Sequence, residues 1–345
     1  MPYSLSTDLS HDTNDMGQLG VPHLKAYWLR MMAIRNGEIH GNNTEYHTDR
    51  LMLHSLGLGL EQTIQFLLVH APDFVQFEQW VVATAGHPSA ESIARLHALI
   101  NKTQASPATM ALHAQIASMP DVLSQDDLQH WEQFGYVILS EAVSKQDSAA
   151  AAQVVWNAVG AQPDDVDSWY HDSHSNIMVQ LFQAPAFEKN RRALRIHKAY
   201  AQLWGTVDLW ASVDRCGFNV PERDAYRFQG PDLHWDMSLQ QPVPFATQGI
   251  LYLTDTPPEQ GALTLVPGFH HQLSTWLNGL ADDEDPRKQD LHALGSMPIG
   301  GKAGDLIIWH QALPHGSRPN RGRQPRLVQY INMFPAKLEI QENWL

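Results

Sequence analysis

Two short stretches, Asp232–Ser238 (DLHWDMS) and Trp309–Ser317 (WHQALPHGS), carry the most informative residues of this sequence. Side chains alternate between the two faces of an extended chain, so His234 and Asp236 are expected to point to the same side. An imidazole and a carboxylate placed side by side can begin a metal site. Such a site needs a third ligand, and the second stretch offers His315.

Two histidines and one carboxylate on one face of a metal leave its other coordination positions open. This arrangement binds non-haem Fe(II) and lets the iron take up a cosubstrate and O2. The chain has 19 histidines, and most His-x-Asp pairs are surface or hydrogen-bonded residues. The His234–Asp236 pair alone is therefore weak evidence for a metal site, and the neighbouring residues have to support it.

The residues after the second stretch reverse the local sign of charge. Arg318, Arg321, Arg323 and Arg326 follow His315 closely, in a chain whose formal net charge is −14. This cluster predicts a bound anion. Arg326 also opens an apolar, strand-like run, where a guanidinium can hold a carboxylate with two parallel hydrogen bonds.

These motifs together resemble the phytanoyl-CoA dioxygenase family of Fe(II)- and 2-oxoglutarate-dependent oxygenases. The resemblance rests on the His-x-Asp pair, on the His-Gly-Ser-x-Pro-Asn motif that begins at His315, and on the spacing of Arg326. Phe134–Leu139 is similar to the opening strand of the family. The resemblance covers about residues 121–345 and leaves the first third unexplained.

A further segment resembles a second family signature, Asn-Gly-x-Leu-x-x-x-Pro-Gly-Ser-His. Gln248–Asp255 reads as a strand, and Gln260–His270 then follows the signature. Gln260 stands where the family usually has Asn, and Phe269 stands where it usually has Ser.

The resemblance implies an α+β fold, in which a double-stranded β-helix (jelly roll) with flanking helices follows an all-helical N-terminal region. It implies that His234, Asp236 and His315 bind Fe(II) and that Arg326 binds the distal carboxylate of 2-oxoglutarate. Thr264 and Tyr252 are candidate second contacts to this cosubstrate, and each could equally be an interior strand residue. The reaction would consume O2, oxidise a small molecule and release succinate and CO2.

Several alternatives remain open at this stage. His310 precedes His315 closely and could be the distal ligand, but the family pattern follows His315. A non-catalytic jelly-roll protein could keep the metal site. A cupin-like zinc or manganese hydrolase or isomerase would not need Arg326.

Related halogenases lack the carboxylate, so Asp236 favours hydroxylation or a related oxidation. The substrate and the oligomeric state stay undetermined.

Composition narrows the class of protein and its compartment. The chain has 345 residues, of which 43% are hydrophobic, enough for a sizeable core. Its 37 acidic against 23 basic residues argue against a nucleic-acid partner, because such binding depends on neutralising phosphates. We find no membrane-spanning run and no signal peptide, and the single cysteine, Cys216, fits a reducing compartment. We therefore expect a cytoplasmic protein.

The pattern along the chain predicts three regions. Residues 1–18 are polar and expected to be flexible, and residues 19–120 form a helical domain with a connector. The oxygenase domain is expected at 121–345. In the helical domain His40, His47, His54 and His70 suggest a second metal site, but no carboxylate cluster joins them, so we interpret them as surface and cap residues. We expect helices at about 21–36, 44–56, 58–69, 73–85, from 88 onward, 124–134 and 144–160.

Short strands separated by Pro and Gly are expected to dominate the remainder. The region 169–185 is interpreted as substrate-contacting loops. A helical insertion with an acidic tip at 282–285 is predicted over 274–293. The expected strands are 136–139, 208–214, 225–228, one at His234, 248–254, 263–266, 305–309 and 326–334.

Overall fold

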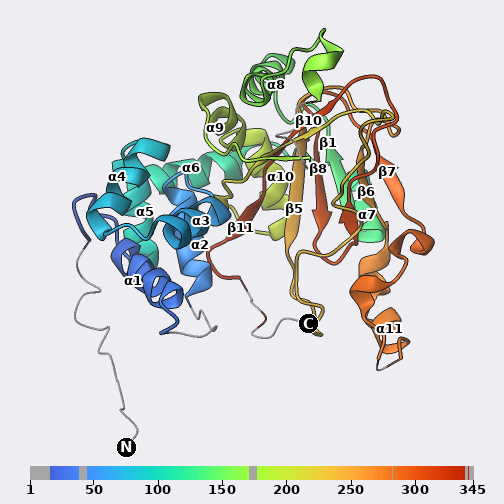
Figure 1. Ribbon diagram of the computed structural model, residues 1–345. Coiled ribbons are helices and arrows are strands. Elements are labelled where there is room, and N and C mark those ends of the chain that lie inside the picture. Colours follow the sequence, from blue (N-terminus) through green and yellow to red (C-terminus); the bar gives the residue numbers. More distant parts are fainter. Residues whose placement is uncertain (1–15, 39–44, 171–176, 282, 339–340, 342–345) are drawn as a thin grey trace, which may run out of the picture. The chain divides into compact units, whose positions relative to one another are not determined.

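A computed structural model describes residues 16–38, 45–170, 177–281, 283–338 and 341 (Figure 1). The chain divides into two compact units, Met1–Gln115 and Ile116–Leu345. Some expectations fall on positions outside the described residues: most of the flexible start, His40, part of the 169–185 loops and Asp282 of the acidic tip. No helix in the described ranges combines the length and the apolar character that crossing a membrane requires.

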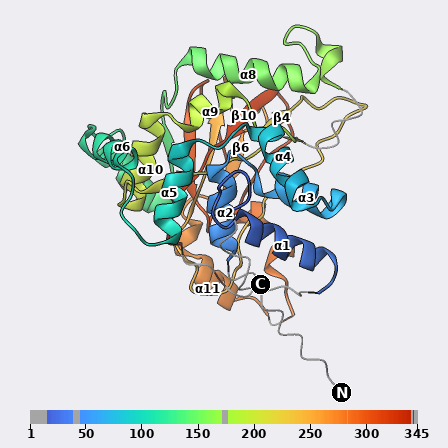
Figure 2. The same cartoon turned by 90° about the vertical axis from the view of Figure 1, so that its left-hand side faces the viewer.

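In its described part the first unit consists of helices joined by turns (Figure 2). Asp73 begins one of them with a capping box, because its carboxylate accepts from the Gln76 backbone and the Gln76 side chain accepts from the Asp73 backbone. The apolar stripes of the helices meet in one core that includes Leu24, Leu53 and Phe77. The helices are α1 (Leu24–Arg35), α2 (Tyr46–Ser55), α3 (Leu60–His70), α4 (Phe74–Ala85), α5 (Ala90–Ile100) and, across the boundary, α6 (Pro107–Ser118).

The second unit combines helices with antiparallel sheets. The larger sheet has the order β1 (Tyr136–Leu139), β8 (Leu306–His310), β5 (Thr247–Tyr252), β10 (Arg326–Tyr330), β4 (Cys216–Asn219), β2 (Met178–Val179). A three-stranded sheet has the order β7 (Met297–Ile299), β6 (Leu263–Leu265), β9 (His315–Gly316). A third sheet pairs β11 (Met333–Pro335) with β3 (Leu209–Ala211).

One hydrophobic cluster joins the larger and the three-stranded sheet. It contains Ile307 and Val328 from the larger sheet and Leu265 from the smaller one. Trp235 belongs to the same cluster, is 3% exposed, and donates its indole N–H to the Ala312 carbonyl at 2.9 Å. Burial of this ring fixes the stretch that carries His234 and Asp236, because large aromatic side chains contribute strongly to a core.

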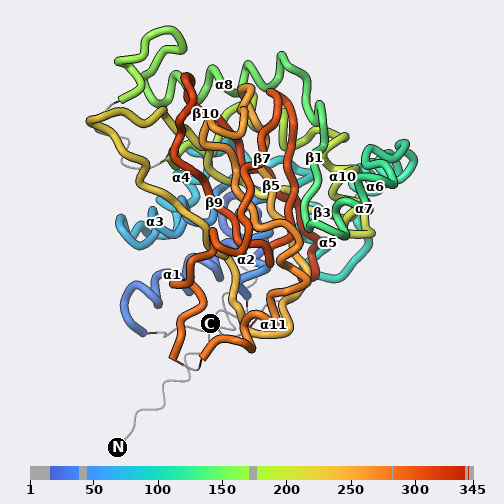
Figure 3. Tube along the Cα trace, turned by 90° about the vertical axis from the view of Figure 1, so that its right-hand side faces the viewer, coloured from blue at the N-terminus to red at the C-terminus, as the bar shows by residue number. Residues whose placement is uncertain are grey.

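Helices α7 (Gln125–Phe134), α8 (Lys145–Val159), α9 (Pro185–Arg191) and α10 (Leu194–Trp204) complete the second unit, and Figure 3 shows its trace from another side. Ser124 caps α7 by accepting from the Asp127 backbone. Buried polar contacts hold two of these helices in place: Asn190 of α9 donates to Gln329 of β10 at 2.9 Å, and Tyr200 of α10 donates at 2.7 Å to the carbonyl of Ile331, which directly follows β10.

Several sequence-based expectations for this unit are wrong. His234 forms only an isolated bridge with His315, and the expected strand 326–334 is divided into β10 and β11, which belong to different sheets. Residues 225–228 form no strand, since Arg223 and Tyr226 close a tight turn through an isolated bridge. The helical insertion is not continuous, because Gly279 and Pro286 interrupt it. It forms α11 (Leu273–Asn278) and the 3-10 turns η4 (Pro286–Lys288) and η5 (Leu291–Leu294). Strands β2, β4, β7 and β9 and helices α9 and α10 were not expected.

We propose that the second unit is a domain that folds alone. A fragment 107–345 keeps α6 intact and should unfold cooperatively on heating. A shorter fragment, 125–345, should have a lower Tm, because Gln202 would lose its hydrogen bonds with the backbone of Val122 and Leu123. An insoluble or non-cooperatively melting 107–345 fragment would show that the helices of the first unit are part of the oxygenase core.

Candidate metal centre

The structure brings together the three side chains that the sequence singles out. His234 Nε2 lies 3.3 Å from Asp236 Oδ1, and His315 Nε2 lies 3.1 Å from Asp236 Oδ2. One ligand atom from each residue lies within 4.8 Å of the others, and the two imidazole ring centres are 4.7 Å apart. These separations suit a single metal ion with three protein ligands.

Backbone pairing holds the two histidines opposite each other. The His234 N–H donates to the His315 carbonyl at 2.9 Å, and the His315 N–H donates to the His234 carbonyl at 3.0 Å. Gly316 then passes so close to Asp232 that an added methyl group would overlap its carbonyl. The glycine after the distal histidine is therefore required for this close approach.

Each histidine turns one nitrogen away from the site. His234 Nδ1 lies 2.6 Å from the Asp232 carbonyl, and His315 Nδ1 lies 3.2 Å from the Leu313 carbonyl. A carbonyl only accepts, so each Nδ1 carries the proton and each neutral ring has its Nε2 lone pair free. Both Nε2 atoms face the Asp236 carboxylate, which itself only accepts. This convergence of acceptors fits a cation, and metal-binding histidines commonly have such carbonyl partners.

Charge within the group keeps Asp236 ionised. Burial opposes this, but when the two rings are protonated and no metal is bound, their Nε2–H groups donate to Asp236 and, with their positive charge, hold the pKa of Asp236 far below its ordinary value. Burial likewise disfavours protonation of His234, yet the carboxylate outweighs it and raises the pKa of that imidazole. A metal ion would take the place of these protons.

Gln248, on β5, is a functional candidate that the sequence analysis missed. Its amide nitrogen donates to Asp236 Oδ2 at 2.8 Å, and its amide oxygen accepts from Trp309 Nε1 at 2.8 Å. Because the indole N–H only donates, it fixes which end of the amide faces Asp236. The available signal was a glutamine just before the apolar residues of β5, which begins Thr-Gln-Gly-Ile-Leu.

His310, the alternative distal ligand, lies outside this group. Its ring packs near Trp131, Phe245 and His270. Its Nδ1 accepts from the Ala312 backbone at 3.0 Å, and burial lowers the pKa of His310 to about 4. This geometry gives His310 a packing role and favours His315 as the ligand.

Arg326 is a buried cation without a carboxylate partner among the described residues. Its side chain is 0% exposed, and it donates to the Gly261 carbonyl at 2.7 Å and to Ser317 Oγ at 3.1 Å. Its Nε is buried with no hydrogen-bond acceptor in the described part of the chain. A buried unpaired charge is costly, so this guanidinium fits an anionic ligand.

The two other predicted cosubstrate contacts are already engaged. The Tyr252 hydroxyl donates to the Ile299 carbonyl at 2.7 Å and accepts from the Leu263 backbone at 3.0 Å, so it has no proton left for a carboxylate. The structure thus favours the interior-strand alternative for Tyr252. Thr264 Oγ1 accepts from Arg318 Nε at 2.8 Å and donates to the Ala262 carbonyl over a longer 3.3 Å.

One other group of potential ligands occurs among the described residues, His23, Glu45 and Asp49 in the first unit. The Arg30 guanidinium pairs with both carboxylates. A cation is therefore already present there, and the group is an ion-pair network. His47, His54 and His70, which the sequence analysis assigned to the surface and to helix caps, belong to neither group.

Comparison with known proteins places this chain in a family. A family model described as phytanoyl-CoA dioxygenase matches residues 116–328. A putative phytanoyl-CoA dioxygenase of Dictyostelium discoideum is 21% identical over 264 residues, which cover 60% of this chain and 74% of that protein. A methylphosphonate hydroxylase of Gimesia maris is 24% identical over 225 residues, which cover 62% and 81%.

Solved structures are similar only at a distance. The non-heme alpha ketoglutarate dependent epimerase SnoN has 17% identity and a TM-score of 0.44, with 68% of this chain and 87% of that chain covered. EvdO2 of Micromonospora carbonacea complexed with 2-oxoglutarate has 16% identity and a TM-score of 0.44, with 66% and 96% covered. The family match over more than half of the sequence is what decides: the chain belongs to the phytanoyl-CoA dioxygenase family and is an oxidoreductase that uses Fe(II), 2-oxoglutarate and O2.

Proposed function

We propose that the protein oxidises a small molecule, by hydroxylation or a related oxidation, at an iron bound by His234, Asp236 and His315. The main support for this proposal is that the Nε2 lone pairs of His234 and His315 and the carboxylate of Asp236 converge on one point. Bound Fe(II) would activate O2 while 2-oxoglutarate is converted to succinate and CO2.

Other residues of the chain prepare this site in our proposal. The carbonyls of Asp232 and Leu313 keep the metal-facing nitrogens free of protons, and Gln248 holds one oxygen of Asp236. Arg326 receives the distal carboxylate of 2-oxoglutarate, since it is fully buried and has no acidic partner among the described residues. Thr264 remains a candidate contact, because its longer bond to Ala262 is the easier one to exchange.

We also propose that the larger sheet and the three-stranded sheet form the two layers of a double-stranded β-helix. Their shared hydrophobic cluster supports this, as does the distribution of the site over both of them. In this arrangement Gln248 and Arg326 come from the larger sheet, while His315 comes from the smaller one.

The proposed substrate is a small molecule, in a cytoplasmic setting. A net charge of −14 is unfavourable for nucleic acid, and the buried single Cys216 suits a reducing compartment. The similarity to a methylphosphonate hydroxylase supports a small polar substrate. A non-catalytic ligand-binding role is the competing proposal. Substrate-stimulated succinate release over a panel of amino acids, osmolytes and phosphonates separates the two, because only an enzyme turns over.

Replacing His315 by Ala should abolish iron-dependent succinate release, because the site would lose one of three ligands. The matched control is His310→Ala, which removes a packed imidazole and should retain a measurable fraction of the activity. Circular dichroism and thermal melting show whether both variants are folded. Equal loss in two folded variants would contradict the assignment of His315.

Arg326→Lys keeps the positive charge but removes the planar fork. Loss of one charge-assisted hydrogen bond costs about 1.5–3 kcal/mol, so the apparent affinity for 2-oxoglutarate should fall by roughly 10- to 100-fold. Titration calorimetry with a redox-inert metal measures this. The control, Arg323→Lys, changes an exposed arginine and should bind normally. An unchanged titration in Arg326→Lys would mean that another residue binds the distal carboxylate of 2-oxoglutarate, and Arg318 or Arg321 would be tested next.

A further inference from the structure

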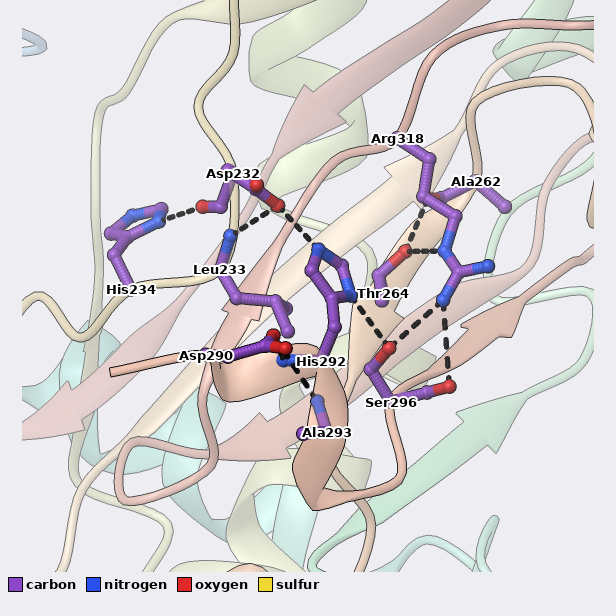
Figure 4. A network of polar contacts seen from close by, with 10 residues as sticks. All are labelled: Asp232, Leu233, His234, Ala262, Thr264, Asp290, His292, Ala293, Ser296 and Arg318. Carbon is purple, nitrogen blue, oxygen red and sulfur yellow. Dashed lines mark hydrogen bonds and ion pairs between the residues drawn. The ribbon is translucent and has the colours of Figure 1, made fainter. Parts of the chain in front are cut away.

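A series of polar side chains runs from Arg318 to the segment that carries His234 (Figure 4). Arg318 donates to Ser296 Oγ at 3.0 Å, and Ser296 Oγ lies 2.7 Å from His292 Nδ1. His292 Nε2 then lies 2.7 Å from Asp232 Oδ1. At the end of the series, the carbonyl of Asp232 accepts from His234 Nδ1 at 2.6 Å.

The chemistry of the end groups sets the direction of these hydrogen bonds. A guanidinium only donates and a carboxylate only accepts, so His292 Nε2 must donate to Asp232. Ser296 accepts from Arg318 and keeps its own proton for His292 Nδ1. Every bond then has one donor and one acceptor, and a positive charge at one end is linked to a negative charge at the other. Such connected bonds strengthen one another.

Asp232 is the residue on which this series and the metal centre meet. Its backbone carbonyl orients the His234 ring, while its side chain accepts from His292 and, at 2.8 Å, from the Leu233 N–H. The side chain is 70% exposed, so it would rotate freely without such partners. His292 therefore restricts the residue whose carbonyl fixes the proposed iron ligand.

The position of His292 is itself defined by local structure. It lies in η5 of the insertion, where the Asp290 carboxylate caps the turn by accepting from the His292 and Ala293 backbones. At the other end, Arg318 follows the second histidine ligand and also donates to Thr264 of β6. The series thus connects the insertion with the segments that carry both histidine ligands.

We propose that His292 and Asp232 are positioning residues for the iron ligand His234, acting through the hydrogen bond between their side chains. This inference rests on the proposed iron centre. Neither side chain reaches the metal in this role. Loss of either one should loosen the Asp232 carbonyl, so that His234 Nε2 is presented to the metal for a smaller fraction of the time. Changes to such outer partners typically weaken metal binding 10- to 100-fold.

The test uses Co(II) as a redox-stable probe, with the visible absorption of the full-length protein giving both affinity and coordination geometry. Asp232→Ala, which has no side-chain acceptor for His292, and His292→Ala should each bind Co(II) about 10-fold more weakly and alter the Co(II) spectrum. The double variant should be no weaker than the worse single variant, because both remove the same contact. Asp126→Asn, which removes an exposed carboxylate on α7, and His87→Ala, an exposed histidine, are the controls and should match the wild type.

Thermal melting without metal separates positioning from simple loss of structure. The apo Tm of both variants should match the wild type, while the rise of Tm on adding Co(II) should be smaller. If His292→Ala fails to fold, Ser296→Ala tests the same series from its middle and should also weaken Co(II) binding. Wild-type Co(II) affinity and spectrum in the folded variants would overturn the inference.

The His315→Ala variant distinguishes this failure from failure of the iron centre. Loss of Co(II) binding there, with wild-type binding in Asp232→Ala and His292→Ala, overturns only the positioning role. Unchanged Co(II) binding in His315→Ala would instead overturn the proposed centre, and the positioning role with it.

Discussion

The site depends on one electrostatic constraint: a carboxylate faces two imidazole nitrogens whose rings carry their protons elsewhere. Asp236 cannot donate, and His234 and His315 give their Nδ1 protons to backbone carbonyls. Three acceptors close together repel one another unless positive charge lies between them. Protons satisfy this constraint partially, as the raised pKa of His234 indicates, and a metal ion satisfies it fully.

The rest of the unit serves to keep these acceptors together. Backbone pairing sets His234 opposite His315. Trp235, which lies between His234 and Asp236 in the sequence, is buried in the core and anchors this stretch. Gln248, oriented by Trp309, restrains the carboxylate from the larger sheet. His315 lies on β9, His234 is paired to it through an isolated bridge, and Gln248 on β5 holds Asp236. Because paired strands hold side chains more rigidly than loops do, these attachments can keep the geometry of the site before any metal arrives.

Arg326 adds a second electrostatic constraint, in this case a buried positive charge that needs a negative partner. A fully buried guanidinium has only a carbonyl and a hydroxyl as partners among the described residues, so its charge is left without compensation. The metal ion compensates the three acceptors, and an acid that binds the metal at one end and this guanidinium at the other compensates the arginine. 2-Oxoglutarate has the two ends that such a bridge requires.

Local sequence patterns singled out the residues of the centre, because alternation along an extended segment was expected to place His234 and Asp236 on one side and the distal motif offered His315. The structure brings the three together, although His234 forms only an isolated bridge and Asp236 lies in a bend. They also singled out Arg326 by its place at the start of an apolar run. Gln248 and His292 could not be found this way, since their roles depend on contacts with residues distant in sequence. The roles of Tyr252 and Thr264 stayed open for the same reason, because only tertiary structure reveals which groups occupy their hydroxyls. The predicted helical insertion is interrupted at Gly279 and Pro286. Both residue types disfavour a continuous helix, but the prediction gave more weight to the apolar pattern of the segment.

In our proposal one iron is bound by His234, Asp236 and His315, and Arg326 holds its cosubstrate. Anomalous X-ray diffraction at the iron edge, from crystals grown without oxygen in Fe(II) and 2-oxoglutarate, tests it most directly. We expect one anomalous peak in contact with both Nε2 atoms and the carboxylate, with the distal acid of 2-oxoglutarate on the Arg326 guanidinium. A peak at His310, or an oxoacid bound away from Arg326, would contradict it.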